Sequence, residues 1–314
     1  MIPPVRPITL ADIEVARQRI RGTVLRTPLV RFDERILLKL ENLQPTNAYK
    51  IRGGANAVAA LSDEARSRGV WTISAGNAGQ GVAYAARQFG IPCTVVAIET
   101  APQTKLDRMR ALGATIVPVS YDQAWVAAET HQFEGLDATF VHPFDNHEFI
   151  AGHGVMGLEI VEDCPDVRTV ISAIGGGGLI TGVGSAIKAL SPEAKVLGAE
   201  PETAAPYALS LREGGPQKFT DWQASFVDGA GGKSVTERMW DRMQAVVDGT
   251  ITVTLDQTSD AMRLIAEKSR TIAEGAGALS VAAALSDPSL EGPIVCVVSG
   301  GNIDLDKYCV LIRR

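Results

Sequence analysis

The chain has 314 residues, of which 46% are hydrophobic and 21% charged, with a net charge of −6. This composition is typical of a globular protein and excludes disordered and fibrous classes, while the absence of a basic block argues against nucleic acid or a membrane surface as a partner. No segment reaches the roughly 20 apolar residues of a membrane span, and the first ten residues lack the pattern of a signal peptide. The four cysteines are widely spaced, without a CxxC pair, so we expect reduced thiols in a cytoplasmic protein.

Strand and helix patterns alternate along the first half of the chain. Periodicity predicts helices over residues 9–21, 52–62, 80–89 and 102–112. Short apolar, β-branched runs predict strands over residues 36–40, 70–73, 92–98 and 115–119.

The second half repeats this alternation. We predict strands over residues 170–174, 195–200 and 293–298, and helices over residues 179–190, 258–273 and 277–285. Such a succession indicates parallel sheets with helices on their faces.

Four polar or glycine-rich loops follow strands or open helices. Lys50 precedes two glycines, and it is either a solvated lysine or one that forms a Schiff base with a carbonyl cofactor. Residues 74–81 are either an ordinary turn or a site for a carboxylate at a helix N-terminus. The four glycines 175–178 predict a phosphate site, because a backbone without side chains can wrap an anion. Residues 299–302 are a plain turn or a place where Ser299 meets a ring nitrogen.

In their order and spacing, these loops resemble the fold type II, tryptophan-synthase-β-like enzymes that use pyridoxal phosphate, and among them the threonine/serine dehydratase and serine racemase family. The resemblance runs from residues 26–29 through residues 40–42, 49–53, 74–77, 143–145, 175–178 and 274–278 to residues 299–302. It implies an α/β fold of two open parallel-sheet domains with helices on both faces. The large, cofactor-binding domain should comprise residues 1–67 and 148–314, and the small mobile domain residues 68–147.

The resemblance also implies roles for individual residues. Lys50 should carry the cofactor and act as the catalytic base, and Ser74 should be a second catalytic residue. The cofactor should further contact a set of residues that surround its ring and phosphate: Tyr49, Asn77, Gly175, Gly176, Gly177, Gly178, Leu179, Gly229, Glu274 and Ser299. The substrate carboxylate should bind at Ser74, Ala75, Asn77 and Ala78.

The sequence departs from the family pattern at three places. Ala75 stands where racemases have a serine that acts on the face opposite lysine, so we expect weak or absent racemisation. Glu200 and the Ala204 carbonyl could hold Mg²⁺ or Ca²⁺, but Pro206 replaces the aspartate expected to assist them. His153 stands where glutamine is commoner, and it is either structural or reaches the site.

The expected activity is β-elimination of ammonia from a small β-hydroxy amino acid such as L-threonine or L-serine, giving a 2-keto acid. The alternatives are a serine- or aspartate-type racemase, a dehydratase for 3-hydroxyaspartate or phenylserine, a non-catalytic binding protein and, from another class, a nicotinamide-dependent oxidoreductase. The glycines do not match the GxGxxG spacing of that last class. We expect a homodimer or homotetramer.

Overall fold

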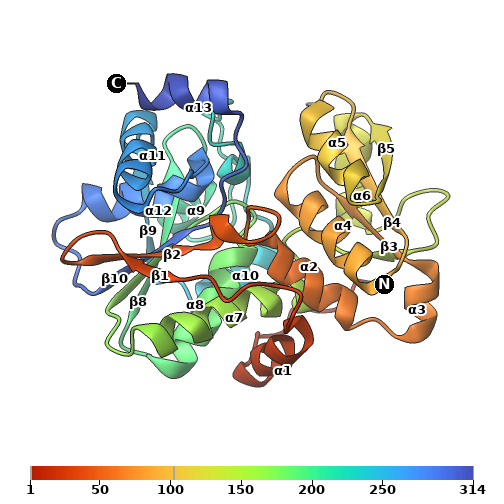
Figure 1. Ribbon diagram of the computed structural model, residues 1–314, viewed down its shortest axis with the longest axis horizontal. Helices are drawn as coiled ribbons and strands as arrows, with labels where there is room; N and C mark the ends of the chain where they lie inside the picture. The colour runs from red at the N-terminus through yellow and green to blue at the C-terminus, as the bar shows by residue number, and fades with distance from the viewer. Residues whose placement is uncertain (1, 102, 314) are drawn as a thin grey trace.

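The computed structural model describes residues 2–101 and 103–313, so the predicted helix start at residue 102 lies outside the described residues. The strands form two separate sheets, which lie in two lobes of the molecule (Figure 1). Among the described residues, no helix is long and apolar enough to cross a membrane.

The large sheet has six strands in the order β1-β2-β10-β7-β8-β9. Only β1 is antiparallel to its neighbour, and the other pairs are parallel. The strands are β1 (Leu29–Arg31), β2 (Ile36–Leu40), β7 (Thr169–Ala173), β8 (Lys195–Pro201), β9 (Gly249–Val253) and β10 (Ile294–Val298).

The small sheet has four parallel strands in the order β5-β4-β3-β6. They are β3 (Val70–Ile73), β4 (Cys93–Ile98), β5 (Thr115–Val119) and β6 (Thr139–Phe140). We call this sheet with helices α4, α5 and α6 the small lobe, and the large sheet with its helices the large lobe. The small-lobe strands lie within residues 68–147, while the exact domain limits stay a prediction.

The helices surround both sheets. In the small lobe they are α4 (Asn77–Phe89), α5 (Gln103–Ala111) and α6 (Tyr121–Thr130). The others are α1 (Leu10–Ile20), α2 (Lys50–Ala59), α3 (Asp63–Arg68), α7 (His147–Asp163), α8 (Gly178–Leu190), α9 (Pro206–Glu213), α10 (Glu237–Gln244), α11 (Leu255–Ser269), α12 (Gly275–Ser286) and α13 (Leu305–Ile312), with short 3-10 turns η1 (Glu41–Leu43) and η2 (Asp228–Ala230).

Strand β10 shows why helices cover both faces of the large sheet. All five of its residues are apolar and buried. Ile294, Cys296 and Val298 pack into a core with α11 and α12, whereas Val295 and Val297 enter the core that contains α7 and α8. Because alternate side chains of a strand point to opposite faces, both faces must be covered. The predicted α/β fold with helices on both faces is therefore confirmed.

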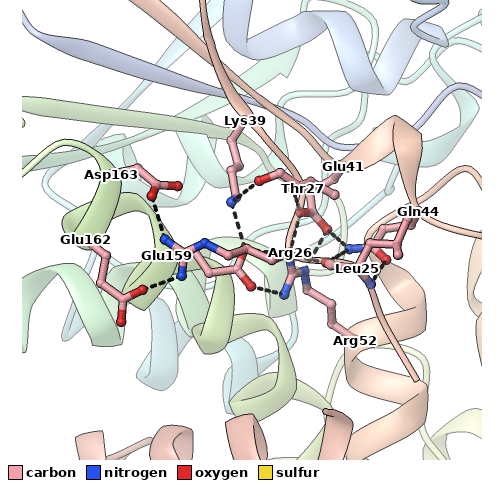
Figure 2. Close-up of polar contacts among 10 residues, drawn as sticks. All are labelled: Leu25, Arg26, Thr27, Lys39, Glu41, Gln44, Arg52, Glu159, Glu162 and Asp163. Carbon is pink, nitrogen blue, oxygen red and sulfur yellow. Dashed lines mark hydrogen bonds and ion pairs between the residues drawn. The ribbon is translucent and has the colours of Figure 1, made fainter. Parts of the chain in front are cut away.

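A buried ionic cluster joins α2 to β2, η1 and α7 within the large lobe, and Figure 2 shows its members. The guanidinium of Arg52 donates to both oxygens of Glu41, at 2.8 and 2.9 Å, and to both oxygens of Glu159, at 2.9 and 2.8 Å. The amine of Lys39 lies 2.7 Å from Glu159 and donates to the Thr27 carbonyl at 2.7 Å. Two cations thus neutralise two carboxylates away from water. Arg52 is two residues beyond Lys50, so the cluster anchors the first turn of α2.

Candidate active site

A cavity of about 480 Å³ lies between the two lobes, and Lys50 is one of its lining residues. Lys50 is the first residue of α2, and its Nζ donates a hydrogen bond to the Pro143 carbonyl at 2.6 Å. Burial lowers the pKa of this amine from 10.5 to about 7. A sheltered lysine that is uncharged in part at neutral pH is the nucleophile that Schiff-base chemistry needs.

Helix α2 holds Lys50 in place by close backbone packing against α4 of the small lobe. A Cβ atom on Gly54 would lie 2.7 Å from the carbonyl oxygen of Gly81, and one on Gly81 would lie 2.8 Å from the carbonyl oxygen of Lys50. Only glycine fits at such a distance. The two glycines therefore let the lobes meet directly at the lysine.

The tetraglycine loop forms a second, smaller cavity of about 40 Å³, which Lys50 and Ser299 also line. Gly177 caps α8 with a φ of 84°, in the left-handed region that favours glycine. A Cβ on Gly176 would overlap the ring of Phe144, and one on Gly175 would lie 2.9 Å from the Gly229 carbonyl. The start of α8 leaves backbone N–H groups that are unpaired within the helix at this small cavity, which suits a phosphate. We call the cavity wall formed by Gly175 to Gly178 the glycine cradle.

The turn after β3 brings Asn77 into the large cavity at the N-terminus of α4. Ser74 accepts a hydrogen bond from the Gly76 N–H at 3.1 Å, which fixes the shape of the turn. Ala75 and Ala78 line the same cavity, so the predicted carboxylate site lies across from Lys50 in the lobe opposite. A helix N-terminus here suits a carboxylate for the same reason that α8 suits a phosphate.

Glu274 and Ser299 complete the wall of the large lobe. The Glu274 carboxylate accepts a hydrogen bond from Asn77 Nδ2 at 2.7 Å, and burial together with the charge of Asp228 raises its pKa to about 7. Ser299 is buried at the end of β10, and its carbonyl accepts from the Tyr49 N–H at 3.0 Å. Gly229 lines both cavities.

These positions fit pyridoxal phosphate. The glycine cradle would hold its phosphate, Lys50 its aldehyde, Tyr49 one face of its ring, Asn77 an oxygen and Ser299 a ring nitrogen. The structure brings all of these predicted residues together around the two cavities. Their individual roles remain proposals.

Sequence reasoning gave no role to several residues of the site. Pro143 and Phe144, after β6, contact Lys50 and the glycine cradle, and Lys105 forms an ion pair of 2.8 Å with Asp228 at the cavity wall. Asn302 donates to Asn77 Oδ1 at 2.9 Å. The stretch 143–145 and Asn302 fall in motifs that carried the family resemblance, which was the one available signal.

The two histidines nearest the site, His142 and His153, are buried. His153 is fully buried behind the site, with its ring centroid 4.7 Å from that of Tyr49, and neither of its nitrogens has a hydrogen-bond partner in the described part of the chain. Burial lowers its pKa well below the usual value. His142 Nδ1 accepts from the N–H groups of Phe144 and Asp145, at 3.3 and 2.9 Å, and so shapes the segment that carries Pro143.

Glu200 has hydrogen-bond partners of its own in the structure, and the cation site at Glu200 and the Ala204 carbonyl stays a prediction. Its two oxygens each accept a backbone N–H of α9 at 2.8 Å, from Tyr207 and Ala208, and Pro206 begins that helix. The carboxylate therefore caps a helix. Across residues 2–101 and 103–313, no three His, Cys, Asp or Glu side chains gather as a metal site.

The chain resembles known proteins over nearly its whole length. It is 41% identical to an L-threonine ammonia-lyase of Thermotoga maritima over 98% of this chain and 79% of the relative. It is 35% identical to a catabolic L-threonine dehydratase of Staphylococcus aureus over 98% of this chain and 92% of the relative. Among solved structures, maize serine racemase superposes with a TM-score of 0.90 at 33% identity, over 97% of each chain.

Residues 20–300 match the family model described as "Pyridoxal-phosphate dependent enzyme". This match covers both lobes, the glycine cradle and Lys50, and it removes the basis for the nicotinamide-dependent alternative. The chain belongs to the family of pyridoxal-phosphate-dependent enzymes.

Proposed function

We propose that this chain is an ammonia-lyase that converts a small β-hydroxy amino acid, L-threonine or L-serine, into a 2-keto acid and ammonia. The observation that carries the proposal is the partly buried Lys50 side chain, whose amine has a pKa of about 7 and lies between the tetraglycine loop and the N-terminus of α4. The relatives named as threonine ammonia-lyase and threonine dehydratase support the choice of substrate.

When bound, pyridoxal phosphate supplies an electron sink for the negative charge that develops at the substrate Cα. The chain's own residues do the rest. The N-terminus of α4 binds the substrate carboxylate and turns the Cα–H bond toward Lys50. The uncharged Nζ accepts that proton, and the Pro143 carbonyl holds the amine in position.

Elimination is favoured over racemisation in this site. Racemisation needs a second proton donor on the face opposite Lys50, and Ala75 has no proton to give. Ser299, a neutral hydroxyl, offers a ring nitrogen no full negative charge, so charge at Cα is short-lived and loss of the β-hydroxyl as water is the faster outcome. Gly175 to Gly178 would hold the cofactor phosphate, which supplies the proton that this hydroxyl needs to leave.

The test is a keto-acid release assay over the stereoisomers of serine, threonine, 3-hydroxyaspartate and phenylserine, with chiral analysis of the remaining amino acid. We expect 2-keto acid from L-threonine or L-serine and little D-isomer. Substantial D-serine, or a preference for hydroxyaspartate or phenylserine, would replace this proposal by one of those alternatives. No turnover with cofactor bound would favour a binding protein.

We also propose a cytoplasmic homodimer or homotetramer. The four cysteines are free thiols, which supports a reducing compartment. The exposed apolar side chains Leu305 and Val310 on α13 support self-association. Sedimentation analysis of the holoenzyme tests the oligomeric state, and a monomer would contradict it.

A further inference from the structure

Helix α5 of the small lobe reaches the large lobe with two cations that lie three residues apart. Lys105 pairs with Asp228 at 2.8 Å, and Nη1 of Arg108 donates to Oδ1 of Asn302 at 2.9 Å. Residues at this spacing share one helix face, so both cations face the large lobe. Arg108 does not line the cavity that contains Lys50, yet it contacts Asn302, which does.

Arg108 and the Thr46 carbonyl together fix the orientation of the Asn302 amide. A guanidinium has donors and no acceptor, so the atom that faces it must be the amide oxygen. The Nδ2 of Asn302 then points the other way, where it donates to the Thr46 carbonyl at 2.8 Å and to Asn77 Oδ1 at 2.9 Å. Both of its hydrogens are used.

The same logic carries to Asn77. Its Oδ1 accepts from Asn302, so its Nδ2 must face the opposite side, where it donates to Glu274 at 2.7 Å. An amide nitrogen has two hydrogens, and this bond uses one of them. The second remains available for a ligand oxygen in the cavity that Asn77 lines.

We propose that Arg108 is a positioning residue, which acts through Asn302 to present the Asn77 amide as a hydrogen-bond donor to the cofactor. The chain of contacts runs from the small lobe to the large lobe, back to the small lobe and on to Glu274. It therefore forms only when α5 meets the large lobe, which ties the donor at Asn77 to closure of the cavity. The inference rests on the proposed function, since it needs pyridoxal phosphate in the site.

The experiment compares the holoenzyme with four variants: R108M, R108K, R108E and, as a matched control, R110M. Arg110 also lies on α5, but in the part of the chain that the structure describes its ion pair is with Asp107 of the same helix. Two readouts besides activity are used: the dissociation constant of pyridoxal phosphate, and the ratio of the visible to the ultraviolet absorbance band of the bound cofactor. The ratio reports hydrogen bonding to the cofactor oxygen, which a general loss of stability would not change.

We expect R108M to weaken cofactor binding by about fivefold to tenfold, the size of one lost hydrogen bond, and to lower the absorbance ratio. R108E should weaken cofactor binding more than R108M does, because a carboxylate accepts hydrogen bonds and would draw the Nδ2 of Asn302 toward itself. R108K keeps a donor and should stay within about twofold of the parent, as should R110M.

Any other order of the variants in cofactor affinity and absorbance ratio overturns the inference. In particular, R108M with parental affinity and spectrum would show that Arg108 does not act on Asn77, and equal losses in R108M and R110M would point to the charge of α5 alone. These outcomes differ from a failure of the proposed function, in which the parent chain itself would bind no pyridoxal phosphate and form no visible band.

Discussion

Gly81 of α4 lies against the carbonyl group of Lys50, where a Cβ atom would come within 2.8 Å of the oxygen. The contact joins a helix of the small lobe to the residue that should bear the cofactor. Movement of one lobe against the other should therefore shift the backbone at Lys50.

We predict that Gly81→Ala separates α2 from α4 and destabilises the protein by about 1–3 kcal/mol, the usual cost of overpacking. It should also weaken cofactor binding, because Lys50 would shift. Urea unfolding and cofactor titration measure the two effects. Gly215→Ala is the control, since a Cβ there meets no atom within 4 Å. Equal unfolding free energies and equal cofactor affinities in the two variants would show that the close approach of Gly81 to Lys50 does not matter for stability or cofactor binding.

The lowered pKa of Lys50 predicts the pH dependence of cofactor attachment. The neutral amine is the nucleophile, so the rate at which apoprotein captures pyridoxal phosphate should rise with pH and reach half its maximum near pH 7. Stopped-flow absorbance gives this rate, with Nα-acetyllysine as the unburied reference. A midpoint near 10, as for the reference, would mean that burial does not lower the pKa.

His153 should make the fold sensitive to acid. Its pKa is lowered by burial, so the unfolded chain takes up a proton below pH 6.5 while the folded chain does not. Stability is thus complete above pH 6.5 and falls as pH drops below it. We predict that the stability of His153→Leu relative to the parent rises by about 1.4 kcal/mol for each pH unit below 6.5. Urea unfolding at pH 7.5 and 5.5 measures the difference, and a pH-independent difference would argue against a neutral buried imidazole.

The buried cluster of Arg52, Lys39, Glu41 and Glu159 in Figure 2 should contribute strongly to stability. Arg52→Met leaves the buried carboxylates of Glu41 and Glu159 with only the ammonium of Lys39, and we expect a loss of about 3–5 kcal/mol in the free energy of unfolding. Arg26→Met is the matched control, since Arg26 pairs with Glu162 and Asp163 at the surface and should cost less than about 1 kcal/mol. Similar losses in both variants would contradict the role of burial.

Much of the fold was predictable from sequence because strands buried on both faces are continuous apolar runs. The predicted strands at 36–40, 70–73 and 115–119 match β2, β3 and β5. Those at 92–98, 195–200 and 293–298 differ from β4, β8 and β10 by one residue at one end, and the one at 170–174 is displaced by one residue from β7. The edge strands β1, β6 and β9 gave no such run and were missed, whereas the edge strand β5 was found.

Helix α7 was also missed, although it has 17 residues. Its three glycines, at 152, 154 and 157, suggest a loop, but they are required by packing. A Cβ on Gly152 would overlap the carbonyl of Arg52 in α2, and one on Gly157 would lie 2.8 Å from the Val183 carbonyl in α8. Local propensity cannot reveal glycines that serve tertiary contacts.

In the site, the residues with local signals were found and those defined by distant partners were not. Lys50, the tetraglycine loop and Ser299 stand in recognisable loops. The bond of Lys50 to Pro143 and the ion pair of Lys105 with Asp228 join residues 93 and 123 positions apart, and no local pattern specifies them. The contacts of Glu200 with the start of α9 were likewise not predictable, because they depend on a helix that the sequence did not predict.

The central claim is that the Lys50 amine carries the cofactor and moves the substrate proton, and one comparison tests it most directly. The parent chain and Lys50→Ala are loaded with pyridoxal phosphate, treated with borohydride and digested, while parallel samples are assayed for ammonia from L-threonine. We predict that the cofactor mass is fixed on the peptide containing Lys50 in the parent, and that Lys50→Ala shows neither that adduct nor ammonia release. A variant that keeps the yellow colour and full ammonia release would contradict the account.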